Sequence, residues 1–392
     1  MIPTQNPLVT KLLDTILDHL DIPKSYYEKA AARHKSLGEW LCRPSSKVAG
    51  YHPEVSSQGS FRYGTVNRPV LATQEYDLDN VTTLALAKTA MTQKQLKELY
   101  GAEIKGYARA TGMLDPVKEM DRCWRLVYAD EANFHLDTLP CVPEEQAVIL
   151  RITSTGVPPE LSALAVAITD RRHRQYDQIT PALLSSNPRG FARWFERCAR
   201  VMAEERMRQL VKGRQYASVE DVPPYEWKTP LQRSIQILKR HRDVMFLENP
   251  DARPISMIIT NLAAHAYGGE ADLGSSLTGI VERMPQYVMP SRPRVPNPTD
   301  PAEDYADKWA KDPTLEDNFW LWHTQVKIDI ARLPKFLSDK NLASSVRSTF
   351  GVELTQEQIK QFEGPKAAAA VIVGSGPALH IPTAPRPWGD GV

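Results

Sequence analysis

Two aspartates separated by one residue, Asp77 and Asp79, are the first candidates for chemistry in this sequence. They lie in segment 76–85, YDLDNVTTLA, which its alternating side chains predict to be a β-strand. On a strand, residues i and i+2 point to the same face, so the two carboxylates would be close neighbours. Like charges at that separation repel unless cations neutralise them. Hard divalent cations that also bind phosphate oxygens, Mg²⁺ in particular, would meet this need.

A third carboxylate is available on a later predicted strand. Asp137 lies in segment 134–139, FHLDTL, where Phe134 and Leu136 are expected to face the core on the opposite side. The chain between the two acidic segments is long enough for a helix and a strand, which would return it to the same sheet. Three carboxylates can hold two metal ions at the separation that in-line phosphoryl transfer requires.

A Gly-Ser pair upstream, Gly59-Ser60, could supply the phosphate-binding half of such a site. Glycine lets the backbone approach a triphosphate closely, and the Ser60 hydroxyl and following N–H groups at a helix start can donate to phosphate oxygens. Gly64-Thr65 would end this short helical turn. Each motif alone also fits an ordinary hairpin, a turn or a solvated strand face. Together, the three are typical of polymerase-β-type nucleotidyltransferases.

A closer resemblance follows from motifs in both halves of the chain. The segments run in order from Gln58 to Trp309: QGSFRYGTVNRP, EYDLD, FHLDTLP, SNPRGFARWF, PLQRSIQILKRHRDVMF, PISMIITNLAAHAY and NPTDPAEDYADKW. This series resembles the bacterial cGAS/DncV-like nucleotidyltransferases, the CD-NTases of CBASS anti-phage defence. The resemblance implies an α+β fold, with a polymerase-β-like palm built on a mixed sheet and a C-terminal helical lobe. The implied domains are N-terminal helices and palm at 1–180, helical lobe at 181–363 and flexible tail at 364–392.

The resemblance also implies roles for individual residues. Asp77, Asp79 and Asp137 would be catalytic and would bind two Mg²⁺ ions, with Mn²⁺ as an alternative. The residues implied to bind the nucleotide triphosphate are Gly59, Ser60, Lys239 and Ser256. Lys239 offers a compact point charge suited to a phosphate, but without the resemblance its pattern would favour an ordinary solvated helix lysine.

The implied activity is synthesis of a cyclic di- or trinucleotide from NTPs, ATP among them, with release of pyrophosphate. Two alternatives stay open at this point. One is another polymerase-β-type nucleotidyltransferase, such as one that makes a linear oligonucleotide. The other is a non-catalytic nucleotide-sensing scaffold, although the presence of all three aspartates argues against it.

Composition limits the partners. The 392 residues carry 48 basic and 47 acidic side chains, so no global field favours long nucleic acid or an anionic membrane. The four cysteines are scattered without a zinc-ligand pattern, so a reducing, cytoplasmic setting is expected. The animal member of the wider group binds DNA through a zinc-ribbon insertion. Because this sequence has no such cysteine and histidine cluster, double-stranded DNA is not expected as an activator. We find no signal-peptide pattern and no apolar stretch of about 18 residues. The tail at 364–392 would suit a conjugation partner or a HORMA-type partner.

Helical periodicity predicts the elements around these motifs. Segment 25–41 has Ser25 as a plausible N-cap, and 229–246 carries a Thr-x-x-Gln capping box, with Pro230 at its first position. Proline-rich segment 287–301 is predicted to be a loop. The other predicted elements are a strand at 124–129 and helices at 8–20, 93–111, 191–211, 254–267, 271–286, 302–311, 315–333 and 339–350.

Overall fold

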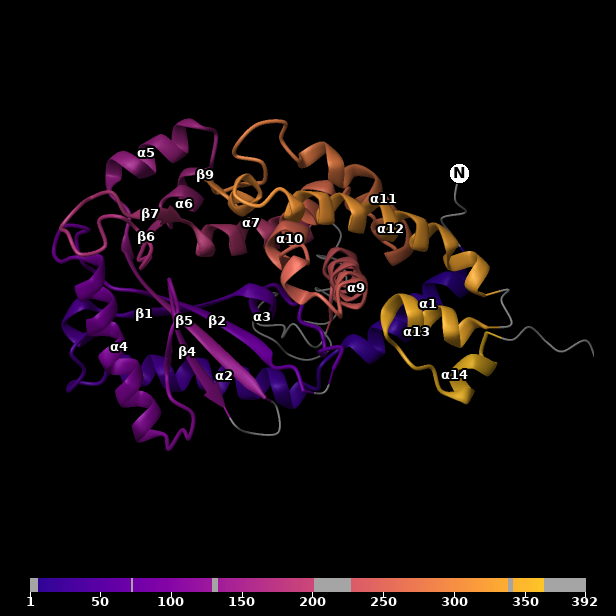
Figure 1. Cartoon of the computed structure of the whole chain (residues 1–392), viewed down its shortest axis with the longest axis horizontal. Coiled ribbons are helices and arrows are strands. Elements are labelled where there is room, and N and C mark those ends of the chain that lie inside the picture. The colour runs from indigo at the N-terminus through magenta and orange to yellow at the C-terminus, as the bar shows by residue number, and fades with distance from the viewer. Residues whose placement is uncertain (1–5, 72, 129–132, 201–226, 338–340, 363–392) are drawn as a thin grey trace, which may run out of the picture. The chain divides into compact units, whose positions relative to one another are not determined.

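A computed structural model describes most of the chain, namely residues 6–71, 73–128, 133–200, 227–337 and 341–362 (Figure 1). Residues up to Leu354 form one compact unit that contains a β-sheet and a group of helices, and a second unit begins at Thr355. Of this second unit, the described part includes helix α14 (Gln356–Lys360). The predicted tail at 364–392 lies outside the described residues, so its partners stay a prediction.

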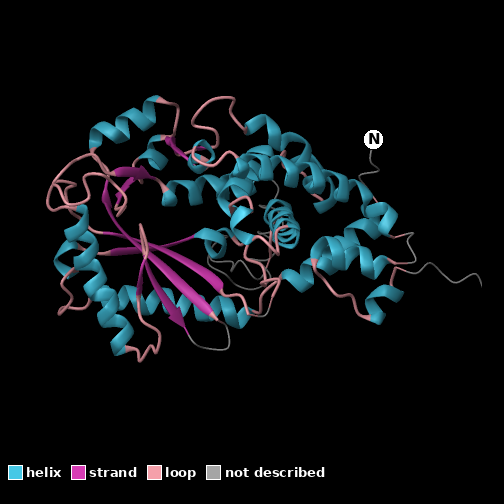
Figure 2. Cartoon of the chain, viewed as in Figure 1, coloured by secondary structure: helices cyan, strands magenta, loops and turns pink. Residues whose placement is uncertain are grey.

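The sheet is mixed, as expected. Its strands are β1 (Glu54–Gln58), β2 (Tyr76–Thr83), β3 (Lys118–Glu119), β4 (Trp124–Tyr128), β5 (Phe134–Pro143), β6 (Val166–Ile168) and β7 (Leu184–Ser186). The order is β1-β2-β5-β4-β3, and the far end of β5 also pairs with β6, which pairs with β7. Strands β2 and β5 run parallel, whereas the other pairs are antiparallel. The parallel pair therefore lies in the middle of the sheet (Figure 2).

The two faces of this sheet have opposite character. Leu78, Leu126 and Leu136 are at most 5% exposed and belong to the core that α2 (Lys24–Cys42) and α4 (Gln93–Ala110) cover. Because side chains alternate along a strand, the residues on either side of these leucines point to the opposite face. That face carries the acidic residues of β2 and β5.

The helical part is built around α9 (Pro230–Met245), which Figure 1 shows among its neighbours. Helices α1 (Pro7–Leu20), α10 (Ser256–Ala266), α11 (Leu273–Arg283), α12 (Thr314–Phe336) and α13 (Leu342–Phe350) all contact it. The predicted capping box is confirmed: the Thr229 hydroxyl accepts from the Gln232 N–H, and the Gln232 side chain accepts from the Thr229 N–H. The other helices among the described residues are α3 (Gly59–Tyr63), α5 (Gln146–Ser154), α6 (Pro159–Ser162) and α7 (Pro188–Arg200), with short 3₁₀ helices at Ala49–Tyr51, Pro250–Ala252, Met284–Tyr287 and Asp307–Ala310.

Several predicted boundaries are wrong. Ser25 is not an N-cap, because α2 begins one residue earlier, after Pro23. The predicted helix at 302–311 begins instead as strand β9 (Asp300–Asp304), which pairs with β8 (Pro296–Asn297) inside the predicted loop. The helix predicted to reach residue 211 is described only to Arg200; its remainder lies outside the described residues. No helix in the described part of the chain is long and apolar enough to cross a bilayer.

Candidate active site

The strand register brings the predicted carboxylates together. In the parallel β2–β5 pair, Asp79 lies opposite Asp137 and Asp77 lies opposite His135. In the antiparallel β4–β5 pair, Arg125 lies opposite the same Asp137. Neighbouring strands are separated by about 4.8 Å, so these side chains share one small area of the polar face. The structure therefore places the three aspartates close together, as the sequence predicts.

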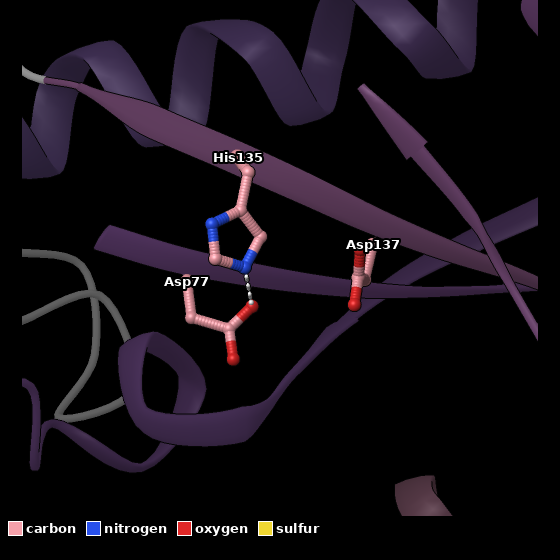
Figure 3. A group of neighbouring side chains, drawn as sticks. All are labelled: Asp77, His135 and Asp137. Atoms are coloured by element: carbon pink, nitrogen blue, oxygen red, sulfur yellow. Dashed lines mark ion pairs between the residues drawn. The ribbon is translucent and has the colours of Figure 1, made fainter. Parts of the chain in front are cut away.

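Asp77 is hydrogen-bonded to a histidine. Its Oδ1 lies 2.8 Å from His135 Nε2, and Figure 3 shows the imidazole turned toward this carboxylate. The other ring nitrogen, Nδ1, lies 2.9 Å from Oε2 of Glu75, the residue just before β2. Burial lowers the pKa of His135, but the hydrogen bond and charge of Asp77 outweigh it and raise that pKa above its usual value. A ring with hydrogens on both nitrogens can donate to both carboxylates.

Asp137 is paired with Arg125. The Arg125 Nε and Nη2 atoms donate to the two Asp137 carboxylate oxygens, each over 2.7 Å, in a bidentate pair. This geometry fixes the plane of the carboxylate as well as its position. Each oxygen retains a second lone pair, so Asp137 could bind a cation while it keeps this partner.

Asp79 is held by packing against a glycine. Gly59 has a φ of +70°, and a Cβ at that position would lie 2.1 Å from Oδ2 of Asp79. Glycine is favoured here for two independent reasons: the backbone conformation, and the contact, which a Cβ would relieve only by displacing Asp79. Burial, followed by the charges of Asp77 and Asp137, raises the pKa of Asp79 well above its usual value.

These residues fit a divalent metal site. Asp77, His135 and Asp137 can each offer one ligand atom, and these atoms lie within 4.8 Å of one another. The charges of Asp77 and Asp137 add to the effect of burial on the pKa of Asp79, so the three carboxylates are close enough for their charges to interact. Carboxylate oxygens are the ligands that hard divalent cations prefer. The carboxylates of Asp77, Asp79 and Asp137 could therefore hold such ions.

The expected phosphate cradle lies beside these carboxylates. Helix α3 begins at Gly59 and is capped after Tyr63 by Gly64, whose φ is +67°, so Ser60 is in its first turn. The Tyr63 ring at its last position is buried and lies 5.4 Å from the ring of Phe191 in α7. Thus α7 supports the cradle from outside the sheet.

Helix α9 fixes the segment that follows α3. The side chains of Gln232, Gln236 and Lys239 donate to the carbonyl oxygens of Tyr63, Val66 and Thr65 over 2.8, 2.8 and 2.9 Å, respectively. These three donors recur at helical spacing on one face of α9. The main chain after the cradle is therefore bound to the helical part of the molecule.

Lys239 is not the solvated helix lysine that its sequence pattern alone would allow. It is 7% exposed, and burial, then the charge of Arg242, lowers its pKa to about 8. Asp77 and Asp79 are close enough for their charges to oppose this shift. Ser256 is the first residue of α10, as expected, but its Oγ accepts from Arg242 Nη1 over 3.0 Å. A role of Ser256 toward phosphate stays a prediction.

Two side chains of the site were not predicted from the sequence: Glu75 and Arg125. The sequence also predicts no role for His135. Strand alternation places His135 and Arg125 on the same faces as the aspartates, so that pattern could have identified them as candidates. Their partners depend on the register between strands, which the sequence did not reveal. Segment 170–177, DRRHRQYD, is also basic, and its Arg172 forms ion pairs with Asp170 and Asp121.

Comparison with known proteins agrees with this geometry. Residues 53–141, which include the cradle and all three aspartates, match the family model described as "Cyclic GMP-AMP synthase DncV-like, nucleotidyltransferase domain". A c-di-GMP synthase of Roseivirga ehrenbergii is 27% identical over 318 residues, which cover 79% of this chain and 76% of that protein. The cyclic dinucleotide synthase CdnG of Bradyrhizobium diazoefficiens is 24% identical over 386 residues, covering 92% and 84%.

Solved structures share the fold. The structure of the Bradyrhizobium CdnG in complex with GTP aligns with a TM-score of 0.68 at 21% identity, over 92% of this chain and 99% of that one. Vibrio cholerae DncV, a cyclic AMP-GMP synthase in complex with the linear intermediate 5′ pppA(3′,5′)pG, aligns with a TM-score of 0.57 at 14% identity, over 88% and 95%. The expected fold class, a polymerase-β-like palm joined to a helical lobe, is confirmed.

Proposed function

We propose, from the premise that this chain belongs to the cGAS/DncV-like nucleotidyltransferases, that it joins NTPs into a cyclic di- or trinucleotide second messenger for anti-phage signalling. In each step a ribose hydroxyl attacks the α-phosphorus of a nucleoside triphosphate, a new phosphodiester forms, and pyrophosphate leaves. The observation that supports this proposal is the register that sets Asp79 opposite Asp137, with Asp77 on the same face and the Gly59 cradle beside them.

The three aspartates would hold two Mg²⁺ ions, or Mn²⁺ in their place. When bound, such ions lower the pKa of an attacking hydroxyl and neutralise the charge that develops on the leaving phosphates. The contribution of the protein is to keep Asp77, Asp79 and Asp137 in fixed positions, so that little reorganisation is needed at the moment of reaction. The hydrogen bond of Asp77, the bidentate pair of Asp137 and the packing of Asp79 each serve this purpose.

The donor triphosphate would lie between the cradle and α9. Gly59 and Ser60 would offer backbone and hydroxyl donors from the first turn of α3. Lys239 reaches the same segment from the other side, and an ammonium group has three donors, of which the Thr65 carbonyl takes one. Ser256 is proposed as a further phosphate contact on the resemblance of its motif. ATP is proposed as one of the substrates.

Incubation with all four NTPs and Mg²⁺ or Mn²⁺, followed by mass spectrometry, tests the activity. We expect a cyclic product, resistant to phosphatase because it has no terminal phosphate. We also expect no product from the folded double variant Asp77→Asn/Asp79→Asn. A phosphatase-sensitive product would identify a linear-oligonucleotide synthase instead. Turnover that survives the double substitution would overturn the assignment of the site, and no turnover of any NTP would favour a nucleotide-sensing scaffold.

The tail at 364–392 is proposed as the contact for a regulatory partner, either a conjugation enzyme or a HORMA-type protein. This proposal rests on the resemblance and the tail's composition, in which charged residues are few. Intact-mass measurement of the chain after co-expression with such an enzyme, compared with a version truncated at residue 363, tests whether the tail is modified.

A further inference from the structure

The three aspartates of the site are held in three different ways. Asp79 packs against Gly59, and Asp137 is clamped by two hydrogen bonds from Arg125. Asp77 has neither kind of support: its side chain is 55% exposed, at the second position of β2. An exposed carboxylate near a strand end is free to change rotamer unless a neighbour binds it.

The neighbour that binds Asp77 is itself well fixed. His135 lies directly opposite Asp77 across the parallel pair, and its side chain is only 12% exposed. Its Nε2 contacts Asp77, whereas its Nδ1 contacts Glu75 Oε2 over 2.9 Å. Both ring nitrogens are therefore occupied by carboxylates. A chain of contacts runs from Glu75 through His135 to Asp77.

We infer that His135 is a positioning residue for Asp77 rather than a metal ligand, and that Glu75 orients its ring. The inference rests on the proposed function, because it assumes that Asp77 binds a metal ion. Both ring nitrogens already bind carboxylates, so coordination of an ion by His135 would break one of these two contacts. Oδ1 of Asp77 accepts from His135, while Oδ2 and the second lone pair of Oδ1 stay available to an ion. Partners that hold a ligating side chain in place commonly change metal affinity or activity by about 10–100-fold when they are removed.

Two substitutions at position 135 distinguish the two ring contacts. Glutamine places a side-chain N–H near the position of Nε2 and can still donate to Asp77. Asparagine is shorter and places its N–H near the position of Nδ1, so it can reach toward Glu75 but not Asp77. We therefore expect His135→Gln to retain most of the wild-type metal affinity and His135→Asn to lose it.

A matched control is a histidine that contacts the other face of β2, the strand that carries Asp77. His34 of α2 contacts Asn80 of β2, with 2.9 Å between Nδ1 and the side-chain oxygen Oδ1. His34 is thus also a histidine that contacts β2, but it lies on the face of the sheet that packs against the core. His34→Asn should leave metal affinity unchanged, and thermal unfolding of all variants checks that each is folded.

Titration with Mn²⁺ in the absence of NTP, followed by EPR of the free ion, measures the affinity without any turnover. We expect Asp77→Asn/Asp79→Asn to abolish binding, His135→Asn to weaken it about 10–100-fold and His135→Gln to stay within about threefold of wild type. In NTP assays, His135→Asn should raise the metal concentration for half-maximal rate, with kcat at saturating metal changed only a few-fold. An affinity of folded His135→Asn equal to wild type would overturn the inference.

Pulsed EPR of the bound Mn²⁺ separates positioning from ligation. If His135 only positions Asp77, substitution of His135 should remove no ¹⁴N coupling from the spectrum of the wild type. Such a coupling would make His135 a ligand and overturn the inference. Mn²⁺ binding that depends on Asp77 and on His135, in a protein that turns over no NTP, would keep the inference and reject the catalytic proposal. Mn²⁺ binding independent of Asp77 and Asp79 would reject both.

Discussion

Two groups of carboxylates in the described part of the chain are bound in opposite ways. The sheet-face carboxylates (Asp77, Asp79 and Asp137) share the open polar face, where a basic side chain, His135 or Arg125, binds two of the three. The β9 carboxylates (Asp300 and Glu303) are paired with neutral donors instead. Carboxylates on an open face that lie close to one another and to basic side chains are suited to bind a further ligand. Carboxylates satisfied by hydroxyl and amide donors are suited to hold two segments together.

The contacts of the β9 carboxylates support this contrast. Ser185 of β7 donates to Asp300 over 2.6 Å, and Ser186 donates to Glu303 over 2.9 Å. Asn297 donates to the other oxygen of Glu303 over 2.7 Å. Burial raises the pKa of Glu303 to about 7, and the hydrogen bonds from Asn297 and Ser186 only partly oppose that shift. This group therefore joins the edge of the palm sheet to the helical part.

Substitution of one carboxylate in each group should give the largest difference. Asp137→Asn is expected to reduce kcat by at least about 10²–10³-fold, the order observed when one electrostatic contact to a transition state is lost. Asp300→Asn should leave kcat within a few-fold of wild type. Steady-state rates of pyrophosphate release measure both. Comparable losses of kcat would show that the two groups do not differ in function.

The glycine next to Asp79 gives the next largest effect. Gly59→Ala should lower kcat/KM by about 10²-fold, since displacement of a catalytic group by about 1 Å can cost this much. Gly112→Ala is the matched control: Gly112 has a φ of +69°, but a Cβ there would meet nothing within 4 Å. Each variant should lose about 1–2 kcal/mol in the free energy of unfolding from the left-handed backbone alone. If Gly112→Ala lost as much activity as Gly59→Ala, backbone strain rather than contact with Asp79 would be the cause.

Loss of the Lys239 charge should have a smaller effect that depends on pH. At pH 7 the side chain is mostly protonated, because its pKa is about 8. Lys239→Met should then lower kcat/KM for NTP by about 10-fold, in the range of a hydrogen bond to a charged group. Toward pH 9 the wild type loses the same charge, so the ratio of its kcat/KM to that of Lys239→Met should approach one. A ratio that stays constant from pH 7 to 9 would contradict a cationic role for Lys239.

The smallest effect should be on stability at Glu303. Its pKa is raised from about 4.5 to about 7 in the folded protein, so the folded state retains the proton longer than the unfolded state. Its contribution to stability therefore falls as pH rises from about 4.5 to about 7, then levels off. Relative to Glu303→Gln, the wild type should become less stable across that interval in chemical denaturation. A difference that does not vary with pH would place Glu303 in a more polar setting than the structure gives.

The sequence by itself determined which residue types lie on which face of the sheet. The alternation around Leu78 and Leu136 placed Asp77, Asp79 and Asp137 on one face, because hydrophobic side chains must enter the core and their neighbours then cannot. The Thr229–Gln232 capping box correctly marked the start of α9, because its hydrogen bonds are local. Local patterns of this kind need no knowledge of the partner segment.

The tertiary structure decided which side chains meet. The contacts of Asp77 with His135 and of Asp137 with Arg125 follow from register between strands that are distant in sequence. Likewise, Lys239 is buried because α9 has neighbours on many sides, whereas its polar sequence fitted a solvated face. At β9 the local helical pattern was overridden by pairing with β8 and by hydrogen bonds to β7. The physical reason is common to all three: pairing and burial are properties of two segments, and neither segment alone specifies them.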